Sequence, residues 1–347
     1  MTPMLKCILF AGLVLLVQRI MYVVVGFGFH KTLFDHAPGP CRKLPPIEYG
    51  SEDITTLPSG IAIISSGLYG PPTSNLYTYN FNNPDKGVQE VKLVNFKRSN
   101  LYPHGMSTWI DPKSGKVTLF LVNHSPDREA VVIFDFNEAE NTLSYKKTIT
   151  DTLFTSLNDV VATGPDTFYA TNFLLFGYKY MLLDKILRLS FASVVFYDGE
   201  KASFVATGLS GANGINISPD KRTVYVATTF SHQVRVYSRK TDSSLEPVKI
   251  LNIYTAPDNI EVDPTTGDLL VGCHPLVHKL LSSKERIKGA SQILHIHFDG
   301  DWNETIREVY ADNGNNFKGS SVASFYGNQM LVGSITGHLL RCDVRGF

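Results

Sequence analysis

Polar residues that could bind a metal ion recur at the starts of six similar β-rich segments. The starts carry Glu52-Asp53, His104, Asn158-Asp159, Asn213, Asp258-Asn259 and Ser320-Ser321. Carboxylate and carboxamide oxygens, without cysteine and with little histidine, form a hard set of ligands that suits calcium and its roughly six to eight oxygens. Zinc would instead require nitrogen or sulfur ligands. The pattern therefore favours calcium.

Turn formation is the alternative explanation, because Asn and Asp are also common where strands begin. At any single start that explanation would be sufficient. Acidic or amide residues recur, however, at four of the six starts, with Asn213 as the weakest of the four. The recurrence favours a metal site over turn formation.

The six segments also predict the fold, because each one repeats the same plan. An alternating apolar stretch follows the polar start, and a turn with Pro, Gly or Asp leads into a second β-rich stretch, as in VVATGPDTFYATN after Asn158-Asp159. Successive starts are roughly 45 to 60 residues apart, which is about one four-stranded propeller blade. We therefore predict an all-β fold, a six-bladed β-propeller in which the polar starts meet at one end of the central channel. A two-sheet sandwich would not explain the recurring polar position.

Composition excludes two other classes of protein. The 347 residues include 32 Lys+Arg and 32 Asp+Glu, so the formal net charge is +0, which argues against nucleic acid as a partner. Only 18% of the residues are charged while 43% are hydrophobic, which argues against a disordered chain. We expect one large folded body.

The first 30 residues form an apolar leader before a body at 31–347. From Leu5 to Phe29 only Lys6, Gln18 and Arg19 interrupt the apolar run, which is about long enough to span a bilayer, although Gln18 and Arg19 are costly near its centre. It is either a signal peptide with its apolar region at 8–17 or a retained signal-anchor. No small-x-small cleavage site follows, which favours the anchor. A buried N-terminal helix is the least favoured interpretation.

Both leader interpretations place the body in the secretory pathway. The propeller is then membrane-anchored and luminal or extracellular, or it is secreted. The four cysteines, Cys7, Cys41, Cys273 and Cys342, contain no CxxC pair, so they give no support for a structural zinc or thioredoxin-like site.

Several long motifs occur in an order that carries a family resemblance. They are GSEDI at 50–54, YPHGMST at 102–108, LNDVVA at 157–162, ANGINISPD at 212–220 and DNIEVDPTTGDLLVGCHP at 258–275. From about Cys41 to Cys342 the chain resembles the serum paraoxonase/arylesterase family, and the leader suggests a membrane-anchored member. The resemblance implies a six-bladed propeller that holds two calcium ions in its channel.

The resemblance also implies which residues bind each ion. The catalytic calcium would be bound by Glu52, Asn158, Asn213, Asp258 and Asn259, and the structural calcium by Asp53, Asp159 and the main-chain carbonyl of Met106. A disulfide between Cys41 and Cys342 is implied as well, which agrees with an oxidising compartment. Cys273 would remain unpaired, as a small buried hydrophobic residue.

Histidines complete the implied site. His104 in YPHG would be the base and His124 in VNH would support it, because a neutral imidazole near a metal-polarised carbonyl can deprotonate water. Tyr69 and His274 are further pocket candidates.

The chain departs from the family pattern where substrate would bind. Phe173-Leu174 replaces a common Asp-His pair, and Gly211 replaces an aromatic residue. Nearby, an amphipathic helix is predicted around 180–190, with Leu182, Leu183 and Ile186 on its apolar face. The resemblance places this helix over the site mouth in contact with lipid; simple packing on the propeller is the alternative.

Two functions follow. The first is a calcium-dependent hydrolase of lactones and aryl esters, with organophosphate triesters as a further substrate class. The second is a membrane-tethered scaffold or chaperone for a membrane-protein partner. In either case the sequon at Asn303 is the expected glycosylation site, whereas those at Asn123 and Asn216 adjoin channel residues and should be closed.

Overall fold

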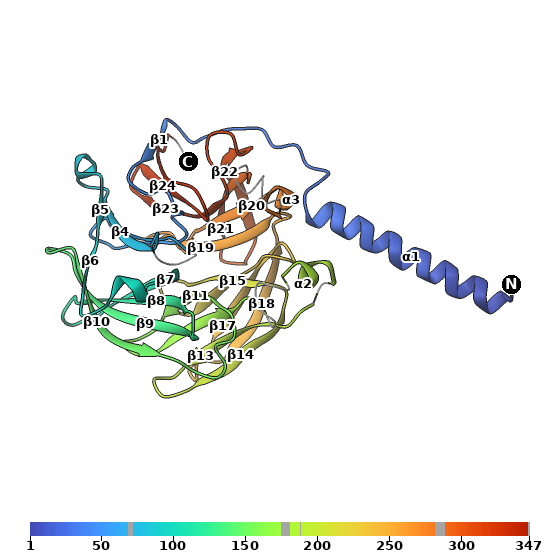
Figure 1. Ribbon diagram of the computed structural model, residues 1–347, viewed down its shortest axis with the longest axis horizontal. Coiled ribbons are helices and arrows are strands. Elements are labelled where there is room, and N and C mark those ends of the chain that lie inside the picture. Colours follow the sequence, from blue (N-terminus) through green and yellow to red (C-terminus); the bar gives the residue numbers. More distant parts are fainter. Residues whose placement is uncertain (69–71, 175–180, 188, 282–288, 346–347) are drawn as a thin grey trace.

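Six sheets arranged around one axis form the body of the protein (Figure 1). The computed structural model describes residues 1–68, 72–174, 181–187, 189–281 and 289–345. Within these ranges the sheets are antiparallel throughout, except that β6 joins β10 in parallel. The prediction of a six-bladed β-propeller is confirmed.

Each blade is a meander of neighbouring strands. Blade 1 contains β2 (Ile54–Thr56), β3 (Ile61–Ser66), β4 (Asn75–Asn80) and β5 (Val88–Glu90). Blade 2 contains β6 (Lys92–Val94), β7 (Pro103–Ile110), β8 (Val117–Ser125), β9 (Arg128–Asn137) and β10 (Thr142–Ile149). Blade 3 contains β11 (Leu157–Ala162), β12 (Phe168–Asn172), β13 (Ala192–Tyr197) and β14 (Ala202–Leu209).

The second half of the chain repeats the plan. Blade 4 contains β15 (Ala212–Ile217), β16 (Thr223–Thr228), β17 (Gln233–Arg239) and β18 (Leu245–Asn252). Blade 5 contains β19 (Ala256–Val262), β20 (Leu269–His274), β21 (Ser291–Phe298) and β22 (Glu304–Asp312). Blade 6 contains β23 (Ser320–Tyr326), β24 (Gln329–Ser334), β25 (Leu339–Asp343) and the N-terminal strand β1 (Cys41–Leu44).

The propeller is closed by joining the two ends of the body in blade 6. Strand β1 pairs antiparallel with β25, and Cys41 lies directly opposite Cys342. The two cysteines form a disulfide across 301 positions of sequence, as the family resemblance implied. Cys273 is free and fully buried, so that prediction is also confirmed.

The hydrophobic core lies between blades rather than at the centre. Leu76 of blade 1 and Phe134 of blade 2 belong to one cluster, and Ile293 of blade 5 and Val332 of blade 6 belong to another. Each of six clusters joins two neighbouring blades in this way. Because the apolar side chains pack between blades, the channel is left to polar residues.

Helix α1 (Pro3–Gly26) extends away from the propeller (Figure 1). Its apolar side chains, such as Leu9, Leu13 and Leu16, are exposed, so the interpretation as a buried N-terminal helix is wrong. Among the described residues, its C-terminal end makes the contacts with the body. There the Tyr22 hydroxyl donates to the Phe230 carbonyl over 3.1 Å, and buried Phe27 packs against Ala256 and Val277.

The other helical segments are short. They are α2 (Met181–Leu187), α3 (Val277–Leu281), and the 3-10 turns η1 (Pro84–Lys86) and η2 (Arg98–Asn100). The helix expected around 180–190 corresponds to α2, which ends earlier; Tyr180 and Arg188 lie outside the described residues. Leu182 and Leu183 are exposed on it, whereas Ile186 packs beside Phe27 and Val277.

Candidate active site

Local irregularities of the inner strands aim the polar residues into the channel. The pairing shifts by one residue between Leu157 and Val160 in β11, and equivalent shifts occur in β7, β15 and β19. In each case the extra residue falls at the polar start of the segment. A β-bulge re-aims side chains in this way, which lets two successive residues, such as Asn158 and Asp159, both serve the channel.

At two of the bulges a glycine follows the polar residue and lies close to the neighbouring blade. A side chain at Gly105 would overlap Asp159, and one at Gly214 would overlap the backbone of Asp258 and Asn259. The His-Gly and Asn-Gly pairs are therefore required by packing as well as by chemistry.

Buried oxygen atoms from four blades have no hydrogen-bond partner within the described part of the chain. They are Oε2 of Glu52 and the Oδ1 atoms of Asn158, Asn213 and Asn259. All four residues are buried, and burying such an oxygen unpaired costs about 1–3 kcal/mol. These four residues and Asp258 are the five expected ligands of the catalytic calcium. The donor set fits a hard cation.

The negative charge buried in the channel also suits a divalent cation. Burial, together with the nearby charge of Asp258, raises the pKa of the Glu52 carboxyl to about 8. Asn259 donates to Glu52 Oε1 over 3.1 Å, and Ser321 donates to the Glu52 carbonyl over 2.6 Å. A second carboxylate thus stands near Glu52 in a buried site, an arrangement that a divalent cation would stabilise.

Deeper in the channel, Asp53 and Asp159 are held by matching hydrogen bonds. The Oδ2 atom of Asp53 accepts from the Met106 N–H over 2.7 Å, and that of Asp159 accepts from the Ile215 N–H over 2.7 Å. Burial raises the pKa of both carboxyl groups well above the usual range, and each is raised further by neighbouring carboxylates. Asp53 thus contacts the Met106 backbone through its N–H, and Asp159 lies near enough to Asp53 for their charges to interact.

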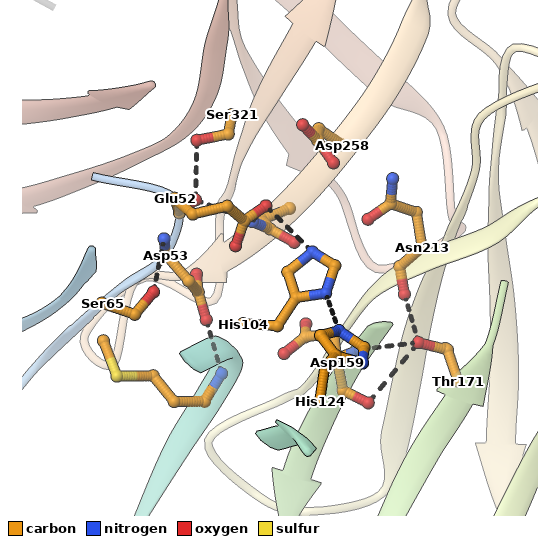
Figure 2. A network of polar contacts seen from close by, with 12 residues as sticks. Glu52, Asp53, Ser65, His104, His124, Asp159, Thr171, Asn213, Asp258 and Ser321 are labelled. Carbon is orange, nitrogen blue, oxygen red and sulfur yellow. Dashed lines mark hydrogen bonds and ion pairs between the residues drawn. The ribbon is translucent and has the colours of Figure 1, made fainter. Parts of the chain in front are cut away.

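A hydrogen bond joins His104 to His124 beside the candidate calcium ligands (Figure 2). Nδ1 of His104 lies 2.7 Å from Nε2 of His124, and Nδ1 of His124 lies 2.7 Å from Oε2 of Glu129. The other ring nitrogen of His104, Nε2, lies 3.5 Å from Oε1 of Glu52. Burial lowers the pKa of His104 to about 4 and also lowers that of His124, which favours neutral rings.

The hydrogen bonds also define the tautomers. An ionised Glu129 only accepts, so His124 carries its proton on Nδ1 and accepts at Nε2. His104 then donates from Nδ1, which leaves the Nε2 lone pair facing the channel. Sequence reasoning missed Glu129, because nothing in NHSPDREA marks it; only the β8–β9 hairpin brings it back beside His124.

One cavity of about 540 Å³ connects these groups to the surface. Figure 2 shows Glu52, Asp258, Asn213 and His104 around a common space. Asn158, His124, Glu129 and His274 also line the cavity. His274 lines the cavity, and its Nε2 lies 2.7 Å from Asp258 Oδ2. Tyr69 lies outside the described residues.

The predicted glycosylation site lies away from this cavity. Asn303 is exposed, and its amide donates to Asp299 over 3.0 Å. Asn123 is buried and donates to the Asn100 carbonyl, while Asn216 donates to the Ile260 carbonyl inside the body. Occupancy of Asn303 stays a prediction.

Residues 36–344 match the sequence model of the protein family that is described as Arylesterase. The chain belongs to the arylesterase family. It is 40% identical over 314 residues to serum paraoxonase/arylesterase 2 of Gallus gallus, with 88% of each chain covered. It is also 36% identical over 347 residues to serum paraoxonase/lactonase 3 of Rattus norvegicus, which covers 97% of this chain and 98% of the relative.

Solved structures share the architecture at low sequence identity. A luciferin-regenerating enzyme is 14% identical, with a TM-score of 0.58 over 89% of this chain and 97% of its own. The calcium-binding protein regucalcin of Agrobacterium tumefaciens is 16% identical, with a TM-score of 0.55 over 91% of this chain and 98% of its own. These likenesses establish the propeller fold.

In this arylesterase-family chain, two aromatic rings pack around Gly211 in the wall of the cavity. Phe173 and Phe230 lie with ring centroids 5.2 Å apart and line the cavity beside Met181. A Cβ at Gly211 would lie 3.0 Å from the Phe230 ring and 3.2 Å from the Phe173 ring. Phe173 and Phe230 therefore form an apolar part of the cavity wall that leaves little room for a side chain at Gly211.

We predict that Gly211→Ala destabilises the protein more than Gly208→Ala. Both glycines have positive φ, +70° and +74°, but nothing lies within 4 Å of a Cβ at Gly208. Each substitution should cost about 1 kcal/mol for the backbone, and Gly211→Ala should cost about 1–3 kcal/mol more for overpacking the aromatic wall. Chemical unfolding of the two variants measures the difference. Equal losses of unfolding free energy would contradict the packing argument.

Proposed function

We propose that the protein is a calcium-dependent hydrolase of lactones and aryl esters, with organophosphate triesters as a further substrate class. The observation that carries the proposal is the set of unpaired buried oxygens on Glu52, Asn158, Asn213 and Asn259 beside the histidine pair. The relatives named paraoxonase, arylesterase and lactonase support the choice of substrates.

Two groups of residues would hold two calcium ions. Glu52, Asn158, Asn213, Asp258 and Asn259 would hold the catalytic ion, and Asp53, Asp159 and the Met106 carbonyl the structural ion. When bound at the mouth-facing set, calcium supplies a Lewis acid that polarises the substrate carbonyl and stabilises the developing oxyanion.

The protein's own residues handle the proton. His104 accepts a proton from water at Nε2, and its Nδ1–H remains hydrogen-bonded to His124. Glu129 holds His124 in the tautomer that makes this geometry work, so it acts as a positioning residue. The apolar wall of Phe173, Phe230 and Met181 receives the aryl or alkyl part of the substrate.

Helix α1 is proposed to remain as the membrane anchor, which leaves the propeller luminal or extracellular. Its end is built into the rim of the cavity, because Phe27 packs against the lining residues Ala256 and Val277. His278 Nδ1 also donates to the Phe27 carbonyl over 2.9 Å. Removal of the leader would uncover these apolar groups beside the site mouth. The membrane surface and helix α2 would then both lie beside the mouth of the cavity.

We predict that the mature protein keeps its N-terminal residues. Mass spectrometry of the intact, deglycosylated chain purified from eukaryotic cells should give the mass of the uncleaved sequence, and alkaline carbonate should leave it in the membrane fraction. A mature N-terminus between residues 18 and 30 would contradict retention.

We predict that substitution of Asp258, from the proposed catalytic set, and of Asp159, from the proposed structural set, has different effects. Asp258→Asn should reduce lactone turnover by roughly 10²-fold or more with little change in stability, because this residue faces the cavity. Asp159→Asn should lower the melting temperature and the calcium retained after dialysis, because binding of the buried ion is coupled to folding. Turnover, thermal unfolding and metal content separate the two. A chelator without effect on wild-type turnover or stability would contradict the calcium assignment.

We predict that His104→Gln and Glu129→Gln lower kcat for lactone hydrolysis while both calcium sites stay filled. The loss should be roughly 10²-fold or more for His104→Gln, which removes the base, and at least about tenfold for Glu129→Gln, which releases its tautomer. Glu129→Asp should recover part of the rate, and KM should change little.

Asp268→Asn is the matched control for this pair of variants. Asp268 makes the same kind of contact to His295 and His297 on blade 5, away from the cavity, so turnover should not change. Wild-type turnover in His104→Gln would remove this histidine from the mechanism. If the wild type hydrolysed no lactone or aryl ester in millimolar calcium, the alternative function, a membrane-tethered scaffold for a membrane-protein partner, would take precedence.

A further inference from the structure

A second cavity, the basic hollow, lies on blade 6 next to the mouth of the candidate active site. It measures about 480 Å³ and is lined by Lys43, Glu48, Asn315, Asn316, Lys318, Thr336, Gly337 and His338. Thr336 lines both this hollow and the cavity of the candidate site, so the two openings are adjacent. They lie on the same end of the propeller as the attachment of α1.

Three segments that are distant in sequence bring the basic groups together. Lys43 of β1 pairs with Leu340 of β25, which places His338 diagonally across from it, two residues before Leu340. The buried Phe317 ring packs edge-on against the His338 ring, with centroids 5.4 Å apart, and Lys318 follows Phe317 directly. The Ser334 hydroxyl donates to the Lys318 carbonyl, which fixes that turn.

The hollow has unused capacity to bind a negative group. Among the described residues, neither Lys43 nor Lys318 forms an ion pair, in contrast to Lys116 and Lys147 elsewhere on the surface. The Nε2 atom of His338 is buried without a hydrogen-bond partner. Both lysines line the hollow together with His338, and burial, followed by the charges of Lys43 and Lys318, lowers the pKa of His338 to about 4.

We propose that the basic hollow binds a phosphate monoester dianion. Two ammonium groups match a charge of about −1.5 to −2, and Lys commonly binds phosphate as a point charge. The side-chain amides of Asn315 and Asn316 and the Thr336 hydroxyl supply further hydrogen-bond donors around the same space. Glu48 is the single carboxylate among the lining residues, and its negative charge limits the affinity for an anion.

Two sources could present this chemistry: the headgroup of an anionic lipid, or a free phosphate. The lipid source is supported by α1, whose C-terminal end packs against Val277 at the rim of the neighbouring cavity. A bilayer entered by this helix would bring headgroups to the same end of the propeller. The inference does not depend on hydrolysis, because no residue of the basic hollow except Thr336 lines the catalytic cavity.

The test uses the full chain, loaded with submillimolar calcium, in nanodiscs of phosphatidylcholine. Thermal unfolding is followed as inorganic phosphate is added, and separately in nanodiscs that contain phosphatidic acid. A ligand that binds the folded state raises the melting temperature in a saturable way. For the wild type we expect such a rise in at least one arm. The arm that responds identifies the source.

Variants assign the response to the basic hollow. Lys43→Gln/Lys318→Gln should weaken the apparent affinity at least tenfold, Lys43→Arg/Lys318→Arg should retain it, and Glu48→Gln should strengthen it. Lys92→Gln/Lys113→Gln, which removes two exposed lysines of blade 2, is the charge-matched control and should respond like the wild type. No shift in either arm for the wild type, or an equal shift in the Lys43→Gln/Lys318→Gln protein, would overturn the proposal.

Discussion

The burial of Glu52 beside Asp258, with amide oxygens left unpaired around them, is the constraint on which the rest of the structure depends. Such a group of acceptors is unfavourable without a cation, because every member prefers a positive partner. The propeller tolerates it since stability comes from elsewhere: the six apolar clusters lie between the blades, and the channel contributes no apolar core. A β-propeller can therefore keep many hydrogen-bond acceptors along its central axis.

Closure of the propeller and the bulges of the inner strands bring the polar groups at the axis within reach of one another. The pairing of β1 with β25 and the disulfide between Cys41 and Cys342 hold blade 6 against blade 1, which keeps Glu52 within reach of Asn259 and Ser321. The bulges in β7, β11, β15 and β19 then turn the polar starts inward. His104 shares one cavity with Asn158, Asn213 and Asp258 because each lies at the bulge of an inner strand.

The sequence predicted the blades and the channel residues because their signal is repeated and local. Asn158-Asp159 and Asp258-Asn259 stand at the heads of similar strands, so a radial arrangement brought them together without knowledge of contacts. Glu129 could not be found this way, since its role depends on a hairpin register. The basic hollow could not be predicted from the sequence for the same reason. Lys43, Lys318 and His338 come from three segments that meet only after the propeller closes. Helix α2 is shorter than its apolar pattern suggested.

Anomalous diffraction from crystals grown with calcium tests the central claim most directly. We predict a strong anomalous peak at about 2.3–2.6 Å from Oε2 of Glu52 and the Oδ1 atoms of Asn158, Asn213 and Asn259, with Asp258 as a further ligand. A second peak is predicted between Asp53 and Asp159. Ordered water without anomalous signal among the four unpaired oxygens, in crystals soaked with millimolar calcium, would contradict the account.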